Sequence, residues 1–578
     1  MTRSETAAAL ALPAAVVAAV SLLGLMFVYP VATVLVEATR AGLAPFLALF
    51  TDPFYFGVFA QAIDQPSVLW TAFPDYELGL FGFTAYQAVL STLASVALGL
   101  PGAYLLARFE FPGRKTVRSL TALPFVMPSI MVATGFIATF GRNGTVNRLL
   151  TAVGLPPVEL LFTLEIIIIA HAFYNAPLVT RIVAAAWEGV DGSITETART
   201  LGASPRQAFR DVVVPQLLPA LLTGALLTFI FTFMSFAIVL ALGGLQLATV
   251  EVWVYNSVSS ADYATAARLA LLETAFSLAL TYAYLRYEAR QRAASASRPP
   301  PRKPLFGPVT ADRLAVWGYM GVALLVFVGP IASMLLASVT GPDGGLTLEH
   351  YQFLVDRQAE AAAFQVKPLT AVLNSLLYGV ASLAVSVPLG LLFAVLSTRE
   401  FAGRKLVDTL AMAPFAVSGV VVGVGLLRGL VFGVPVFGHR IVIAGSLAVV
   451  AAHAVGAYPF VTRSVAPLLS TIDRSVLDSA RTLGASRLRV LVDIELPQVW
   501  PGVLAGTAFA FAISMGEFDS TVILATGGSG YTMPVAIERF IGRRLGPATA
   551  MGCVLLFVTA VSFAVIDRLG GEGGGFGG

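Results

Sequence analysis

The segment "ARTLGAS" occupies residues 198–204 and recurs letter for letter at residues 480–486. Both copies lie among charged residues, although the chain around them is strongly apolar. The surrounding sequence repeats as well, since "EFPGRK" at 110–115 corresponds to "EFAGRK" at 400–405. The chain is therefore a tandem duplication, and its two halves are expected to fold alike.

The composition is that of an integral membrane protein. Of 578 residues, 57% are hydrophobic and 12% are charged, and the mean hydropathy is +0.82. A soluble chain of this length carries far more charge. The net charge of +3 is small and its basic residues lie in short loops, which argues against a nucleic-acid-binding protein. A single cysteine, Cys553, excludes a disulfide within the chain and any cysteine-based zinc or iron–sulfur site.

Apolar stretches long enough to cross a bilayer, roughly 20 residues each, predict about twelve membrane-spanning helices. They centre near residues 11–34, 84–107, 117–140, 162–185, 216–241, 264–285, 313–338, 372–397, 407–431, 441–464, 500–525 and 545–566. Helices are expected because a segment in lipid must satisfy its own backbone hydrogen bonds, and these runs are too long for barrel strands. The first run is interpreted as a retained helix, because its apolar stretch exceeds that of a signal peptide.

The distribution of Lys and Arg predicts the orientation in the membrane. The loop after the second span and the stretch between the halves are basic and are expected in the cytoplasm, whereas the loops at 38–83 and 339–369 are mainly acidic and are expected outside. Both termini are then cytoplasmic. Arg539, Arg543 and Arg544 depart from this rule, because they precede the last span on the predicted outer side.

The repeat predicts two parallel bundles of six helices. Six spans separate equivalent points, an even number, so both halves have the same orientation in the membrane. The first half is assigned to residues 1–292 and the second half to residues 311–578. A Pro-, Arg- and Ser-rich cytoplasmic linker at 293–310 joins them. The fold class is therefore an all-α integral membrane protein.

Both ARTLGAS segments fall in the cytoplasmic loop after the fourth span of their half, at 191–219 and 473–501. In the first loop, Thr195 is expected to cap a short helix that ends at Gly202, where glycine tolerates positive φ, and Pro205 to begin a second short helix. An amphipathic hairpin that only anchors the loop at the membrane surface is the alternative. An identical sequence in both halves favours a pair of docking elements.

These loops resemble the "EAA" loop of permeases in binding-protein-dependent ABC importers of the type I architecture. The matching residues are Glu196, Ala198, Gly202, Phe209 and Pro215 in the first copy and Asp478, Ala480, Gly484 and Pro497 in the second, where Asp478 replaces Glu and Leu491 replaces Phe. The resemblance implies that each loop sits in a cleft of a cytoplasmic ATPase subunit, so that two loops imply two ATPase subunits. The residues implied in coupling are Glu196, Ala198, Arg199, Gly202, Asp478, Ala480, Arg481 and Gly484. The resemblance also implies an extracytoplasmic solute-binding protein and a location in the prokaryotic inner membrane.

The chain is not expected to be an enzyme. It contains no G-x-x-x-x-G-K-[ST] phosphate-binding loop and no Gly-Lys pair. ATP and Mg²⁺ are therefore expected on partner ATPase subunits, and no cofactor or metal on this chain. The "GGSG" at 527–530 imitates a serine-protease motif, but it lies at or beyond a helix end without a suitable histidine.

A few residues within the apolar spans are candidates for the translocation path. They are Pro124, Pro128, His171, Asn175, Pro414, His453, Glu517 and Asp519. The two carboxylates either line a cavity that favours cations, or they pair with an arginine such as Arg428 or lie near the outer interface. For the two histidines, packed and hydrogen-bonded side chains are favoured over ligands. The prolines are expected to kink the third and ninth spans.

The substrate is the least determined feature of the sequence. Fused permeases with two such loops resemble chiefly thiamine and ferric iron importers, and the segment at 235–255 looks most like the thiamine branch. Importers of sulfate, molybdate or polyamines remain alternatives within the family. An ATP-independent secondary transporter is the main alternative outside it.

Overall fold

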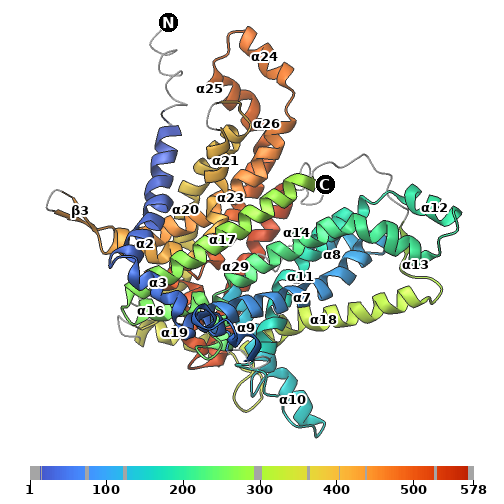
Figure 1. The fold of residues 1–578 in the computed structure, drawn as a ribbon, viewed down its shortest axis with the longest axis horizontal. Helices are drawn as coiled ribbons and strands as arrows, with labels where there is room; N and C mark the ends of the chain where they lie inside the picture. The colour runs from blue at the N-terminus through green and yellow to red at the C-terminus, as the bar shows by residue number, and fades with distance from the viewer. Residues whose placement is uncertain are drawn as a thin grey trace. The chain divides into compact units, whose positions relative to one another are not determined.

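The computed structural model is almost entirely helical over the part of the chain that it describes (Figure 1). The described residues are 14, 16–71, 77–121, 127–291, 302–360, 365–401, 404–436, 439–525 and 530–570. Half of the predicted linker, most of the "GGSG" segment and Pro124 lie outside them. The expected all-α fold class is confirmed.

The first half contains, in chain order, η1 (Gly24–Val28), α2 (Tyr29–Thr39), α3 (Ala44–Thr51), α4 (Pro53–Phe56), α5 (Val58–Asp64), α6 (Val68–Thr71), α7 (Gly79–Arg108), β1 (Phe109–Glu110), α8 (Arg114–Leu120), α9 (Ser129–Phe140), α10 (Thr145–Ala152), α11 (Leu164–Glu188), α12 (Gly192–Thr200), α13 (Pro205–Ala208), η3 (Phe209–Val213), α14 (Val214–Phe233), α15 (Ala237–Gly243), α16 (Val250–Ser259) and α17 (Tyr263–Gln291).

The linker end and the second half contain β2 (Lys303–Pro304), α18 (Ala311–Ser338), α19 (Glu349–Glu360), α20 (Pro368–Ser397), α21 (Arg404–Met412), η4 (Ala413–Ala416), α22 (Gly419–Leu426), η5 (Leu427–Val431), β3 (Val434–Val436), β4 (His439–Ile441), α23 (Gly445–Thr471), α24 (Arg474–Thr482), α25 (Arg487–Val490), η6 (Leu491–Glu495), α26 (Leu496–Gly516), α27 (Thr521–Leu524), α28 (Met533–Ile541) and α29 (Leu545–Gly570). The four short strands form two pairs: β1 with β2 in parallel, and β3 with β4 antiparallel.

Ten helices within the described residues are long and apolar enough to cross a membrane, and a bent pair raises this number to eleven. The bent pair is the expected ninth span, whose two parts meet at 100°. Pro414 lies in the 3₁₀ segment before the break, and Ser418 caps the next helix by accepting a hydrogen bond from the backbone N–H of Val421 at 3.2 Å. The third expected span is also divided, because α8 ends at Leu120 and α9 begins at Ser129. Both interruptions fall in the two spans where the prolines predicted a kink, and in both places the helix is broken rather than only bent.

The compact units of the structure do not coincide with the two sequence repeats. One unit joins residues 1–40 and 257–274 to residues 348–578, and the other joins residues 41–256 to residues 275–347. The first helix of each repeat thus packs within the unit that holds most of the other repeat. Two glycines make this packing close: a methyl on Gly425 would lie 2.4 Å from the carbonyl oxygen of Pro30, and a methyl on Gly135 would lie 3.0 Å from that of Pro330.

Each unit has a core of three long helices: α7, α11 and α14 in one, and α20, α23 and α26 in the other. The helix backbones approach closely at glycines, and at one such glycine in each unit a threonine hydroxyl of the neighbouring helix donates to the glycine carbonyl. Thr180 donates from its hydroxyl to the backbone oxygen of Gly99 at 2.9 Å, and Thr462 donates likewise to Gly390 at 3.1 Å. Small residues and hydroxyl bonds of this kind are typical of helix packing in membranes, where apolar burial gives little driving force.

Large apolar side chains cover the outside of the long helices. Leu324 and Leu325 of α18 are 62% and 74% exposed, and Leu373 and Leu377 of α20 are 65% and 63% exposed. Apolar surface of this extent would be unfavourable in water but is the natural surface in lipid. The structure therefore agrees with the composition in requiring a bilayer.

Candidate functional site

The first ARTLGAS segment forms the turn of a helical hairpin. Helix α12 ends at Thr200, Gly202 has a φ of +96°, and Pro205 begins α13. The backbone N–H of Ala203 donates to the carbonyl of Ala198 at 3.0 Å, and that of Gly202 donates to the carbonyl of Arg199 at 3.1 Å. These two bonds are the Schellman pattern, which needs a residue with positive φ directly after the helix.

The second ARTLGAS segment repeats this geometry. Gly484 has a φ of +90°, Ala485 donates to the carbonyl of Ala480 at 3.0 Å, and Gly484 donates to that of Arg481 at 3.0 Å. A methyl group on either glycine would meet no atom within 4 Å, so positive φ rather than crowding requires glycine here. The predicted turn, with a short helix on each side, is confirmed in both halves.

The start of the first short helix differs from the expectation. Its N-cap is Asp191, which accepts from the backbone N–H of Ser193 at 2.9 Å, rather than Thr195, which lies one turn inside the helix. Asp473 caps α24 in the same way, through Ser475 at 2.9 Å. This hydrogen bond lowers the pKa of Asp473, so the cap stabilises the folded loop at neutral pH and is lost as the pH falls through that lowered pKa.

The two hairpins expose matching apolar side chains. Leu201 and Leu483, next to the turn glycines, are 84% and 88% exposed, and Ile194 and Val476, seven positions earlier, are 49% and 46% exposed. Glu196, Arg199, Asp478 and Arg481 are also exposed, while Ala198 and Ala480 are half-buried. Each hairpin thus presents a leucine at its tip with charged side chains beside it, an arrangement suited to a protein partner.

Each hairpin continues into the core through a π-helical turn. Phe209 of η3 contacts Trp187 at the end of α11, with ring centroids 6.0 Å apart. At the end of η6, the buried Glu495 accepts a hydrogen bond at 2.6 Å from Arg399, which follows α20. The first half has Val213 at the position of Glu495, where it belongs to the apolar core. The hairpins are therefore alike at their tips and different at their bases.

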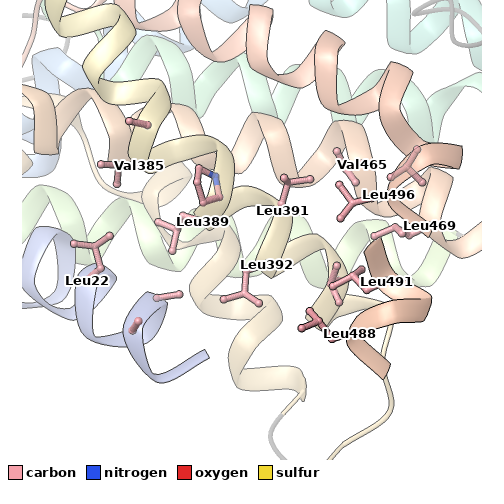
Figure 2. A pocket seen from close by; sticks show the side chains of 16 residues that line it. Leu22, Val385, Leu389, Leu391, Leu392, Val465, Leu469, Leu488, Leu491 and Leu496 are labelled. Atoms are coloured by element: carbon pink, nitrogen blue, oxygen red, sulfur yellow. The ribbon is translucent and has the colours of Figure 1, made fainter. Parts of the chain in front are cut away.

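An apolar pocket of about 450 Å³ lies beside the second hairpin (Figure 2). Leu488 and Leu491 of the hairpin face it from one side, Leu469 of α23 and Leu392 of α20 from others, and Leu22 belongs to the N-terminal helix. Every described residue that lines the pocket is apolar. Such a pocket suits a hydrocarbon chain and offers nothing to hold an ion.

The two histidines occupy equivalent places in the two cores. Nδ1 of His171 lies 3.0 Å from the hydroxyl of Ser91, and its Nε2 lies 2.8 Å from that of Ser235. Nδ1 of His453 lies 2.7 Å from the hydroxyl of Ser514, and its Nε2 lies 2.8 Å from that of Thr521. Both rings are buried. Each histidine thus connects neighbouring segments of its core through both ring nitrogens.

Glu517 takes part in the second of these bridges. Its carboxylate lies 3.2 Å from Nε2 of His453 and accepts hydrogen bonds from the backbone and the hydroxyl of Ser520, at 2.8 and 2.7 Å, and from Thr521. The carboxylate caps the short α27 at the point where α26 ends. Arg428, the partner considered from the sequence, instead pairs with Glu37 at 2.9 Å.

The remaining candidates for the translocation path are spread over several helix breaks. Asp519 lies against α22, where a methyl on Gly419 would come within 2.9 Å of its Cβ. Pro128 is the N-cap residue of α9. Asn175 is buried one turn after His171 and donates to its carbonyl at 3.1 Å, and its own side-chain oxygen has no partner among the described residues. Within one unit, Glu517 therefore contacts His453 and lies near Asp519 beside Gly419, and within the other unit His171 and Asn175 are bonded to each other.

Sequence reasoning missed several charged contacts. Glu188, at the end of α11, pairs with Arg114 at 2.5 Å, Arg118 at 3.1 Å and Arg302 at 3.2 Å. Arg302 stands at the described start of the linker, directly before the β2 strand that pairs with β1. In the second half, Arg404 occupies the position of Arg114, but Ser470 occupies the position of Glu188. The repeat therefore did not indicate this cluster of charges.

A duplicated bundle of membrane-spanning helices with a matched pair of exposed hairpins defines the class of membrane transport permeases. Residues 99–292 and 386–570 each match the family described as binding-protein-dependent transport system inner membrane component. The two matches cover more than half of the chain, so the chain belongs to this family of ABC importer permeases.

Several members with an assigned substrate are similar over most of their length. The chain is 29% identical to the thiamine transport system permease protein ThiP of Brucella suis, over 86% of this chain and 88% of that protein, and 29% identical to ThiP of Escherichia coli, over 88% and 91%. It is 24% identical to the ferric transport system permease protein FbpB of Actinobacillus pleuropneumoniae, over 85% and 70%. A crystal structure of a bacterial ABC transporter for alginate aligns with a TM-score of 0.36 and 19% identity, over 44% of this chain and 92% of that chain.

Proposed function

We propose that the two hairpins couple this permease to two cytoplasmic ATPase subunits, which bind ATP and Mg²⁺. In this mechanism, closure and reopening of the ATPase dimer moves α12 and α24, and the two helix bundles follow as rigid bodies between two packings. The chain supplies the membrane path and the coupling surfaces, and hydrolysis takes place on the partners.

The matched exposure of Leu201 and Leu483 carries this proposal. An isolated surface leucine is ordinary, but two leucines of 84% and 88% exposure at the same position of two identical turns are not. A hairpin that only anchored the loop would turn its apolar face toward the membrane. Here the base of each hairpin is already fixed by the core, through Phe209 in one half and Leu491 in the other, and the tip leucine remains available.

Site-directed crosslinking tests the coupling. In a Cys553→Ser background, single cysteines replace Leu201 or Leu483, and the permease is expressed with its candidate ATPase. Each variant is expected to crosslink to one ATPase subunit, and purified complexes should contain two ATPase copies per permease. A cysteine at Leu346, which is 83% exposed in the predicted outer loop, is the matched control and should give no crosslink. Absence of crosslinks from both hairpins would remove the coupling role and favour an ATP-independent transporter.

Thiamine or ferric iron is the proposed substrate, delivered by an extracytoplasmic binding protein. The names of the relatives support this pair, and thiamine has the greater support because the relatives named for it align over a larger share of their length. Uptake of radiolabelled thiamine and of ⁵⁵Fe³⁺ into cells that carry or lack the gene distinguishes the two. Loss of neither uptake on deletion would reject both substrates and return sulfate, molybdate and polyamines to consideration.

We place both termini in the cytoplasm and the loops at 38–83 and 339–369 on the outer face as the docking surface for the binding protein. The acidic character of these loops and the basic residues of the opposite loops support this orientation. Deleting either loop should abolish uptake while leaving the ATPase bound. Unchanged uptake would exclude that loop from docking.

A further inference from the structure

Arg539, Arg543 and Arg544 stand on the predicted outer side, where arginine is unusual in so short a loop. The structure places Arg539 near the end of α28, and the other two in the turn before α29. Within this unit the turn lies at the opposite end of the long helices from α24, because α26 begins at the second hairpin and leads away from it to α28 (Figure 1). The three arginines therefore mark the end of the bundle away from the coupling loop.

These arginines line one cavity together with a fourth, Arg357 of α19. The cavity has a volume of about 490 Å³, and none of its described lining residues is acidic. Four guanidinium groups around one opening create a positive potential, because their charges outnumber the one carboxylate that pairs with them, that of Glu538. Positive charges held this close repel one another, and an anion bound between them would relieve that repulsion.

Neighbouring side chains hold the guanidinium groups in place. Arg544 lies over the ring of Phe353 at 5.1 Å from its centroid, and Arg539 lies over the ring of Tyr531 at 5.7 Å. Arg357 donates from Nη2 to the side chain of Gln365 at 2.8 Å. Stacking of this kind fixes a guanidinium group over the ring. Nε of Arg539 also lies 3.3 Å from the carboxylate of Glu538, so Arg539 is paired and the unused donors belong to Arg357 and Arg543.

Donor capacity in the cavity is left unused. Nε of Arg357 is buried and has no hydrogen-bond partner among the described residues. Arg543 is exposed, and the structure gives its guanidinium group no ion pair within the described part of the chain. A buried donor without a partner costs free energy unless a ligand or water satisfies it. Both arginines line the cavity, so an anion bound there can accept hydrogen bonds from these donors.

We propose that this cavity, which we call the arginine pocket, binds the phosphate group of an organic phosphate ester at the outer surface of the membrane. Phosphate accepts several hydrogen bonds at once and matches the fork of the guanidinium group. The cavity exceeds a single inorganic ion and has room for the body of an ester against Phe353 and Phe540. This proposal concerns a site apart from the hairpins and does not depend on which substrate the permease carries.

The position of the arginine pocket favours a phospholipid headgroup as the source of the phosphate, with a soluble phosphate ester as the other source. Arg543 and Arg544 immediately precede Leu545, where the last membrane-spanning helix begins, so we expect their side chains near the level of lipid phosphates. Tyr531, which also lines the arginine pocket, is a residue type that is enriched at the membrane interface.

Ligand binding to the full-length permease in dodecyl maltoside micelles, whose detergent carries no phosphate, tests the proposal. Two probes are added separately, phosphatidylglycerol in the micelles and glycerol 1-phosphate in solution, and bound probe is counted by native mass spectrometry. The test variants are Arg543→Gln, whose side chain is exposed, and Arg357→Gln with Arg543→Gln. Arg440→Gln, an exposed arginine in β4, is the control.

The wild type and the control are expected to retain one more molecule of probe than the double variant, with about tenfold weaker binding for Arg543→Gln alone. A difference seen with phosphatidylglycerol only identifies a lipid site, and a difference with glycerol 1-phosphate identifies a site for soluble esters. Equal binding of both probes by all four proteins would overturn the proposal. The single variant keeps the test valid if the double variant fails to fold, since Arg543 holds nothing in place.

Discussion

Replacing Leu483 with alanine should weaken ATPase binding without weakening the permease fold. The side chain is 88% exposed in the free chain, so its removal takes almost nothing from the packing within the second half. If the leucine becomes buried in a cleft of the partner, its burial contributes about 2 kcal/mol. Loss of that contribution corresponds to roughly thirtyfold weaker binding.

Microscale thermophoresis of labelled ATPase with permease in nanodiscs measures this change, and the melting temperature of the permease alone is measured beside it. Leu346→Ala is the control, because Leu346 is 83% exposed but lies in the predicted outer loop. The control should bind the ATPase as the wild type does. Wild-type affinity for Leu483→Ala would refute the argument that the tip leucine enters a partner, and a lowered melting temperature would refute the argument that it is free of the fold.

Three further predictions concern the permease itself. Gly484→Val should destabilise the turn of the second hairpin by about 1 to 2 kcal/mol, because valine disfavours a φ of +90°. ATP turnover by the partner ATPase should then fall while the membrane helices remain inserted. Unchanged turnover would contradict the role of the turn. Arg399→Met should lower the free energy of unfolding by about 3 to 5 kcal/mol, since it leaves Glu495 buried without its partner. The double variant Arg399→Phe with Glu495→Val copies Phe109 and Val213 of the first half and should recover that stability. If it does not, apolar packing cannot replace the ion pair. Gly390→Val should separate α20 from α23, because a Cβ there would lie 2.6 Å from that of Val461; the melting temperature should drop by several degrees, whereas Gly456→Ala, which meets no atom within 4 Å, should leave it unchanged.

The repeat explains what could be predicted from the sequence. It located both hairpins and the turn glycines, because Schellman geometry depends on a few neighbouring residues. It also identified His171 and His453 as an equivalent pair. Hydropathy predicted about twelve spans, whereas the described residues contain ten or eleven, and Pro414 indicated a kink in the ninth. The 100° angle could not be predicted, because an apolar run gives the same signal whether the helix is straight or bent.

Contacts between distant residues were beyond the reach of sequence patterns. Arg399 and Glu495 are 96 positions apart and have no charged equivalents in the first half, so neither local spacing nor the repeat indicated their bond. Glu517 was singled out as a carboxylate within an apolar span, but its partner His453 lies on another helix and was not predicted. The N-cap was misplaced for a simpler reason, since Asp191 and Thr195 are both good caps and only the structure shows which accepts the bond.

The exchange of first helices between the two compact units has a consequence for biogenesis. Residues 16–39 emerge early, but the residues with which they form a unit begin mostly at 348, so most of their native neighbours do not yet exist. At about 5 to 20 residues per second, the first helix waits roughly 15 to 60 s in the membrane. Its outward apolar side chains, such as Val17 and Val36 at 66% and 64% exposure, make lipid a tolerable environment for that interval. The protein cannot complete either helix bundle during the synthesis of its first half. In a chain truncated at the linker, the first helix would lie in the membrane without the residues against which it packs.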